Sequence, residues 1–234
     1  MIFELLTRVY FRFVAAQAGD RLFALNGFSG DSIAEKPVWR SAQGTITATA
    51  KKRFDARVSG ETGAPFVDAP MRELMYTCFM SNRGRQNAAS FLIHDLEYPD
   101  WRAGAEYFES QLIDHDMAAN WCNWAYIAGV GSDSRDGRRF NVVKQSMDYD
   151  PTGWYMKRRC EELADIPAPF IHQPHLLTEE DCKALKFNRE SYPLPFVPLQ
   201  EPPAATVAAL ASAGACISAR PLGGGVTQKK HGAQ

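Results

Sequence analysis

The sequence lacks several features that would assign it to a specialised class of protein. Its five cysteines include no CxxC pair, which argues against a disulfide framework and against a zinc ribbon. Reduced thiols in an intracellular protein are the better interpretation, with cytoplasm, nucleus and organelles all left open. No apolar run reaches the roughly 20 residues needed to cross a bilayer. The formal net charge of -1 excludes a uniformly basic surface, so any contact with DNA would need a local basic patch.

The sequence also has hardly any alternation of apolar and polar residues, so it offers little evidence of β-strands. Apolar residues recur at helical spacing instead, and the predicted fold class is mainly α. The predicted helices cover residues 3–19, 68–77, 82–96, 101–113, 116–128 and 154–163. Asp68 is a plausible N-cap for the second of these helices, with Pro70 in its first turn. Residues 20–65 are rich in Gly, Ser, Thr and Pro and should form loops with short helical pieces.

We expect one helical domain over residues 1–200, followed by a low-complexity, disordered tail over residues 201–234. The chain opens directly on the apolar segment from Phe3 to Phe13, with no cap or signal peptide before it. It therefore looks like the middle of a longer protein. Nothing in the sequence indicates an oligomer.

Three polar groups interrupt the apolar, aromatic-rich sequence between positions 68 and 150. They are Asn82/Arg83/Arg85, Asp114/His115/Asp116/Asn120 and Trp101/Trp124. Charged side chains among Phe, Leu and Ile must be satisfied by one another or by a polar ligand, because burying an unpaired charge is costly. We interpret that ligand as a flavin, whose ring edge offers N3–H as a donor and O2, O4 and N5 as further polar partners.

Each group also has a simpler interpretation. Asp114 or Asp116 could cap a helix with solvated neighbours, and the arginines could be ordinary surface charge or could bind a phosphate at a helix start. The two tryptophans could serve packing alone. A metal at the Asp-His-Asp triplet is less favoured, because neighbouring side chains do not converge on one ion. His172 and His175 are split by a proline and favour a loop, so no metal site is predicted.

Four segments carry a resemblance to a known family: GAPFVDAPMREL, TCFMSNRGRQNAASFL, DWRAGAEYFESQLIDHDMAANWCNW and RRFNVVKQSMDYDPTGWY. Over about residues 3–200 the chain resembles the C-terminal part of the helical FAD-binding domain of the cryptochrome/photolyase family. Gln86, where ordinary photolyases usually carry Met, and Tyr126, where they usually carry Trp, are typical of the DASH branch. The resemblance implies an N-terminally truncated domain, without the family's α/β antenna domain, its earlier helices or its Thr/Ser-rich phosphate loop.

The resemblance assigns most of the polar residues to an FAD site. Asp114 would pair with Arg85 near the flavin, Asp116 would reach its pyrimidine side, and Asn120 would face N5. The other cofactor-binding residues that it implies are Arg8, Asn82 and His115. The residues that it places toward DNA are Arg83, Gln86 and Tyr126.

In this family, tryptophans relay electrons from the surface to photoexcited oxidised flavin. Trp124 matches the flavin-proximal member and Trp101 the middle one, whereas Arg57 stands where the surface-proximal member would be. Arginine cannot carry the hole, so the relay is broken unless Trp39 or Tyr107 substitutes.

The helix predicted over residues 3–19 matches a segment of the family that faces substrate and cofactor. Glu4 matches a substrate-contacting carboxylate and Arg8 a cofactor-side arginine. Thr7 replaces a tryptophan that stacks on the damaged base, and Val9 replaces an acid. Stacking on a flipped base is worth about 1–3 kcal/mol, so the loss of this platform argues against repair competence.

The function implied is that of a blue-light flavoprotein that uses FAD to repair cyclobutane pyrimidine dimers by light-driven electron transfer, mainly in single-stranded DNA. An antenna pigment such as a folate would be present only with an N-terminal domain. Two alternatives stay open: a photoreceptor or regulator without repair activity, and an inactive remnant that holds no cofactor.

Overall fold

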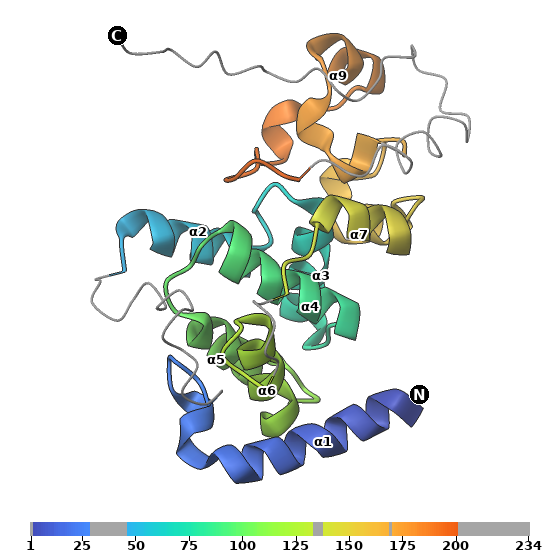
Figure 1. Cartoon of the computed structure of the whole chain (residues 1–234). Helices are drawn as coiled ribbons and strands as arrows, with labels where there is room; N and C mark the ends of the chain where they lie inside the picture. The colour runs from blue at the N-terminus through green and yellow to red at the C-terminus, as the bar shows by residue number, and fades with distance from the viewer. Residues whose placement is uncertain (1, 29–45, 133–137, 169, 201–234) are drawn as a thin grey trace, which may run out of the picture.

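The computed structural model describes residues 2–28, 46–132, 138–168 and 170–200, and all structural statements refer to these residues. The secondary structure within these ranges is helical, with no β-strand, so the mainly α fold class is confirmed (Figure 1). The α-helices are α1 Ile2–Ala18, α2 Ala48–Ser59, α3 Pro65–Thr77, α4 Asn82–Ser90, α5 Trp101–Gln111, α6 Met117–Ile127, α7 Val142–Tyr149, α8 Trp154–Arg159 and α9 Glu179–Leu185. The predicted tail and Trp39 lie outside the described residues.

Helices α1, α5 and α6 form where the apolar periodicity predicts them. Helix α1 gives way at Gly19, whose φ of 55° favours glycine. The helix predicted over 82–96 is two elements, because α4 continues into a π-helix at Phe91–Asp95. The helix predicted over 154–163 likewise ends as an α-helix at Arg159 and resumes as a 3₁₀ turn at Glu161–Leu163. None of the described helices is both long and apolar enough to span a membrane.

Helix α2 is a regular three-turn helix in a segment where the sequence predicts loops with short helical pieces. The Thr47 hydroxyl accepts a hydrogen bond from the Ala50 N–H at its start, and Gly60 closes it with a φ of 66°. Both are ordinary cap signals. The weak apolar periodicity of α2 conceals them, because its buried side chain is an arginine, Arg57.

The prediction that Asp68 caps a helix is wrong. Helix α3 begins three residues earlier, after Ala64, and Pro70 lies in its interior rather than in its first turn. The Asp68 carboxylate is fully buried and accepts hydrogen bonds from the N–H groups of Thr62 and Gly63 and from the hydroxyls of Thr62 and Tyr192. It therefore ties the C-terminal segment to the start of α3.

The helices enclose two apolar cores. The larger core lies among α3, α4, α5 and α6 and includes Trp101, Phe108 and Trp124. A smaller core joins α8 and α9 to α3 through residues such as Met156 and Cys182. Helix α1 crosses below α5 and α6 in Figure 1 and packs on α6. The described cysteines, Cys78 among them, are free thiols.

The Asp68 site generates a stability prediction. Burial raises the pKa of Asp68, and hydrogen bonds from Thr62 and Tyr192 oppose that shift. Tyr192→Phe removes one donor and raises this pKa further, so we expect it to lower the free energy of unfolding by about 1–3 kcal/mol at neutral pH. The loss should shrink as the pH falls through the pKa of Asp68, because the donor stabilises the ionised carboxylate more than the protonated acid.

Urea unfolding of Tyr192→Phe at several pH values tests this prediction. Tyr76→Phe, at an exposed tyrosine of α3, is the matched control and should leave the midpoint unchanged. A loss that grows toward acid pH would contradict the role given to Tyr192.

Candidate functional site

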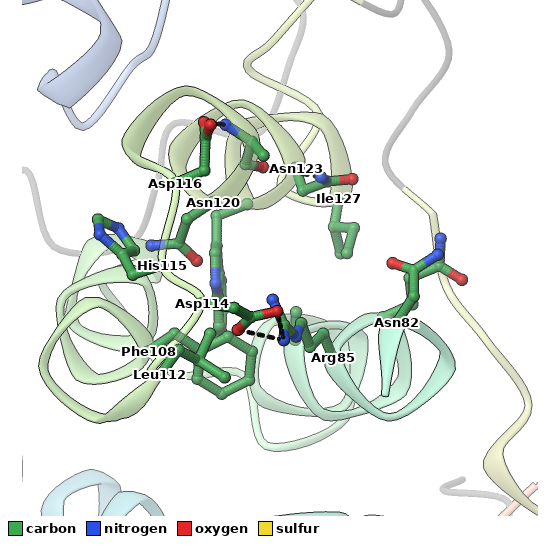
Figure 2. Close-up of a pocket in the computed structure, with 14 residues that line it drawn as sticks. Asn82, Arg85, Phe108, Leu112, Asp114, His115, Asp116, Asn120, Asn123 and Ile127 are labelled. Carbon is green, nitrogen blue, oxygen red and sulfur yellow. Dashed lines mark hydrogen bonds and ion pairs between the residues drawn. The ribbon is translucent and has the colours of Figure 1, made fainter. Parts of the chain in front are cut away.

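A cavity of about 140 Å³ opens between α4, α5 and α6. Figure 2 shows side chains from all three helices, and from the loop before α6, arranged around it. Those that line it are Asn82, Arg85, Gln86, Ala89, Phe108, Leu112, Asp114, His115, Asp116, Ala119, Asn120, Asn123, Trp124 and Ile127. The cofactor-binding residues predicted from the sequence therefore meet at one place, with the exception of Arg8.

Arg85 and Asp114 form the ion pair at the mouth of this cavity. One terminal nitrogen of Arg85 donates to both carboxylate oxygens of Asp114, at 2.7 and 2.9 Å. The Arg85 Nε–H donates to the Met80 carbonyl at 2.8 Å, which fixes the plane of the guanidinium. The Asp114 side chain is half exposed, so its charge is paired but remains accessible to a ligand.

Asp116 performs two roles that the sequence presents as alternatives. Its carboxylate caps α6 by accepting from the Ala119 N–H at 3.0 Å, and it also lines the cavity. Arg12 from α1 donates to the same carboxylate at 2.8 Å. The Ala119 N–H first, and then Arg12, hold the pKa of Asp116 below its usual value.

Arg12 is the arginine of α1 that contacts a residue of the cavity lining directly. Arg8, the predicted cofactor-side arginine, is exposed and reaches Asp116 only as a more distant charge. Arg12, one turn later on the same helix, makes the direct contact. The two arginines stand four residues apart, and the sequence contains no signal that distinguishes them.

Two amides and an imidazole complete the polar lining. The Asn120 side chain donates to the Ala105 carbonyl of α5 at 2.9 Å, and the Asn123 side chain donates to the Ala119 carbonyl at 2.7 Å. The Nε2 atom of His115 is buried without a hydrogen-bond partner and lies 3.9 Å from the Glu109 carboxylate. A buried polar atom at a cavity wall is a group that a polar ligand can satisfy.

Aromatic rings form the apolar side of the cavity. Trp124 and Phe108 meet edge to face with centroids 5.2 Å apart. Trp124 fits because Gly104 faces it: a Cβ at that position would lie 2.2 Å from the Trp124 Cη2. The absence of a side chain at Gly104 therefore lets an indole lie directly against the backbone of α5.

Arg57 lies behind this aromatic wall, fully buried. Its guanidinium carbon is 5.4 Å from the Phe108 centroid and 5.6 Å from the Trp124 centroid. Its Nε–H donates to the Ala88 carbonyl, but both terminal nitrogens lack a hydrogen-bond partner. Burial lowers the pKa of Arg57 to about 9. Arg57, which stands where the family resemblance expects the surface-proximal tryptophan of the relay, is thus a buried cation.

The aromatic cluster extends away from the cavity. Trp101 is buried and donates its Nε1–H to the Leu25 carbonyl at 2.9 Å. It meets Trp121 edge to face, with centroids 5.8 Å apart. The sequence prediction omits Trp121, although its spacing of three residues from Trp124 places both on adjacent turns of α6.

The predicted DNA-facing residues do not all belong to the cavity lining. Gln86 lines the cavity. The Arg83 guanidinium lies 4.3 Å above the exposed Tyr149 ring, and Arg138 lies 5.3 Å from the Tyr126 ring. These four residues of the two arginine–aromatic stacks do not belong to the cavity lining. Glu4 is exposed on α1.

The residues present fit the flavin ring that the sequence predicts. Carboxylates, amides and a guanidinium surround the cavity, and they supply both donors and acceptors to a ring edge that has both. A cavity of roughly 150 Å³ accommodates one benzene-sized ring, so this one suits part of an isoalloxazine rather than a complete FAD. FAD bound here would be held at its ring edge by Arg85, Asp114 and Asn120.

Arg57 generates a second stability prediction. Replacing a buried ion pair by well-packed apolar side chains is often stabilising by about 1–4 kcal/mol. Arg57 is fully buried and both of its terminal nitrogens lack a hydrogen-bond partner, so we expect Arg57→Met to raise the free energy of unfolding by a similar amount near pH 7. The depressed pKa, near 9 in the fold, means that the cost of the charge is fully present below pH 9. It declines as the pH rises above that value.

Chemical denaturation of Arg57→Met beside Lys52→Met, an exposed position on the same helix, provides the measurement. The control should change stability by less than about 0.5 kcal/mol. A strong destabilisation by Arg57→Met would show that the stacked guanidinium stabilises the fold.

Comparisons with known proteins agree on one family. A family model described as the FAD binding domain of DNA photolyase matches residues 2–212. The chain is 48% identical over 209 residues to the cryptochrome DASH of Gloeobacter violaceus, covering 89% of this chain and 39% of that protein. The solved structure of a Synechocystis cryptochrome aligns with a TM-score of 0.73 and 46% identity, over 90% of this chain and 40% of that one.

A more distant match is the structure of an archaeal photolyase from Sulfolobus tokodaii with two FAD molecules. It has a TM-score of 0.65 and 30% identity, over 90% of this chain and 43% of that one. The chain therefore spans about two fifths of the length of the relatives that it matches.

Proposed function

The chain belongs to the family of FAD-binding domains of DNA photolyases, and from that premise we propose that the cavity between α4, α5 and α6 holds the isoalloxazine ring of FAD. The predicted resemblance to the cryptochrome/photolyase family and its DASH branch is confirmed. FAD, the predicted cofactor, is the cofactor of this family.

The ring of paired polar groups around an aromatic wall carries this proposal. Arg85 and Asp114 offer donors and an acceptor to the pyrimidine edge of the flavin, and Asn120 is held against α5 by the Ala105 carbonyl. Trp124 and Phe108 exclude water from the opposite side. Preorganised polar groups in such a setting bind without further reorganisation.

The activity proposed is light-driven repair of cyclobutane pyrimidine dimers, mainly in single-stranded DNA. A dimer can approach a flavin ring in the cavity only if it leaves the base stack, and single strands lower the cost of that step. Bound FAD, when reduced and excited by blue light, supplies the single electron that opens the dimer and receives it back. The protein positions the dimer, excludes water and keeps charges fixed near the ring.

An arginine–aromatic stack supports DNA as the partner. Arg83, which directly follows Asn82 of the cavity lining, places a cation on the exposed Tyr149 ring, and exposed aromatic–arginine surfaces suit single-stranded nucleic acid. Gln86 belongs to the lining of the proposed flavin cavity, so a base extruded toward the flavin would approach it.

A photoreceptor without repair activity is the second candidate, and Thr7 favours it. The Thr7 hydroxyl donates to the Phe3 carbonyl of its own helix at 2.9 Å. It therefore presents a methyl group where the family resemblance expects a base-stacking tryptophan. Light-driven reduction of the flavin would continue in such a protein without loss of dimers.

Asp114 provides the test of flavin binding. We expect Asp114→Asn to weaken FAD binding by about 10–100-fold, because it removes a charge-assisted pair that orients Arg85. Flavin fluorescence titration measures the affinity. Asp148→Asn, which breaks an exposed ion pair with Lys144 on α7, is the matched control. Absence of FAD binding by the unaltered protein would instead favour an inactive remnant.

Thr7 provides the test of repair against signalling. We expect Thr7→Trp to tighten binding of a dimer-containing single-stranded oligonucleotide by about tenfold, the lower end of what base stacking contributes. Dimer loss under blue light, measured against a dark control, reports repair. Photoreduction without dimer loss in both proteins would support the photoreceptor.

A further inference from the structure

We propose, on the basis of the flavin function above, that Trp121 and Glu109 form the outer end of the electron relay in this chain. The relay would run from Trp124 to Trp101 and then to Trp121, with the Glu109 carboxylate as the proton acceptor. Trp121 would replace the surface-proximal tryptophan, the exit of the relay, which the family resemblance places at position 57.

Position 57 cannot serve as the exit. A guanidinium is not an electron donor of the indole kind, and Arg57 is fully buried rather than exposed to a reductant. Its cation lies 5.6 Å from the Trp124 ring. A positive charge at that distance in a poorly solvated core raises the energy of a hole on Trp124, and so drives the hole away from position 57.

The other side of the cluster holds the remaining indoles of α5 and α6. Gly104 allows the Trp124 ring to lie against α5 one turn from Trp101. Trp101 and Trp121 meet edge to face with centroids 5.8 Å apart, and the exposed Phe23 ring covers Trp121 at 4.8 Å. The three indoles of α5 and α6, which we call the seam, thus extend from Trp124 at the cavity to Trp121, beside the half-exposed Glu109.

Glu109 supplies what an outer donor requires. The Trp121 Nε1–H donates to its carboxylate at 2.7 Å, the shorter end of charge-assisted hydrogen bonds. The Glu109 side chain is 47% exposed, so a proton that it receives can pass to water. An oxidised indole is a much stronger N–H acid than a neutral one, and a carboxylate in direct contact can take its proton.

The charges at the two ends of the seam both favour movement of the hole from Trp124 toward Trp121. Arg57 lies beside the inner indole and Glu109 beside the outer one. A hole is therefore repelled at Trp124 and attracted at Trp121. His115 also faces Glu109, at 3.9 Å, which links this carboxylate to the wall of the cavity.

The electrons and protons balance over the relay. Trp124 loses one electron to a photoexcited oxidised flavin, Trp101 then gives one electron to Trp124, and Trp121 gives one electron to Trp101. Oxidised Trp121 transfers its Nε1 proton to Glu109 and becomes a neutral radical. An external thiol later supplies the hydrogen atom that restores Trp121, and Glu109 releases its proton to water.

One arm of the test needs no cofactor. The flavin-free protein carrying Trp154→Phe, which removes the most exposed described indole, is oxidised by photoexcited ruthenium tris-bipyridyl with persulfate. Transient absorption distinguishes the radical cation from the neutral radical, and peptide mass spectrometry locates the oxidation. We expect oxidation to concentrate on Trp121, and Glu109→Gln to slow formation of the neutral radical by about tenfold or more. Both effects should vanish in Trp121→Phe.

The other arm uses the FAD-loaded protein. We expect Trp121→Phe to lower the rate of photoreduction with an external thiol by about tenfold, and Trp121→Tyr to restore part of it. Tyr107→Phe tests the competing exit and should leave the rate unchanged. Circular dichroism melting curves confirm that each variant folds.

The two arms separate the relay from the flavin function. If the protein binds no FAD, the proposed function fails, while the flavin-free arm still decides whether Trp121 and Glu109 accept the hole and its proton. Unchanged photoreduction in folded Trp121→Phe, or oxidation that ignores Glu109→Gln, overturns the relay.

Discussion

The close approach of α5 to α6 at Gly104 is the constraint on which the site depends. Any side chain there would collide with Trp124, and overpacking of this kind displaces a helix or forces an unfavourable rotamer. With glycine present, Trp124 meets Phe108, and Asn120 reaches the Ala105 carbonyl. The aromatic wall of the cavity, one of its amides and the seam toward Trp101 therefore follow from a single missing Cβ.

The two buried charged side chains Asp68 and Arg57 are compensated in different ways in the poorly solvated interior. Asp68 has four donors around its carboxylate, so it connects two segments of the chain. The Arg57 guanidinium contacts one carbonyl oxygen and two aromatic rings, and its terminal nitrogens lack hydrogen-bond partners. A ring face compensates a cation only partly. The buried charge of Arg57 lowers the stability of the fold. The same charge makes oxidation of the neighbouring Trp124 indole less favourable.

The sequence predicts the parts of the structure that have a local cause. Apolar periodicity identifies α1, α5 and α6, and one of the two cap candidates before α6, Asp116, is its cap. Asp68 is misassigned because its hydrogen-bond partners Thr62 and Tyr192 are determined by the folded structure. Local helix propensity cannot reveal a contact with Tyr192, which lies far away in the sequence. Helix α2 is missed because a buried arginine removes its apolar signal. Trp121 is missed because family resemblance directs attention to Trp124 and Trp101, and only the packing shows a third indole beside them.

The charges of the cavity satisfy one another before any ligand is present. Asp114 is paired with Arg85, and Asp116 is paired with Arg12 and with the start of α6. The acids therefore do not depend on a flavin for neutralisation. Flavin binding would instead benefit from preorganisation, because donors and acceptors already fixed by their mutual hydrogen bonds lose little conformational entropy when they bind.

Among these lining groups, the buried His115 Nε2 lacks a hydrogen bond, and it faces Glu109, the carboxylate that contacts Trp121. The binding cavity and the aromatic seam thus share one carboxylate, so a ligand that engages His115 would also alter the charge environment of the outermost indole.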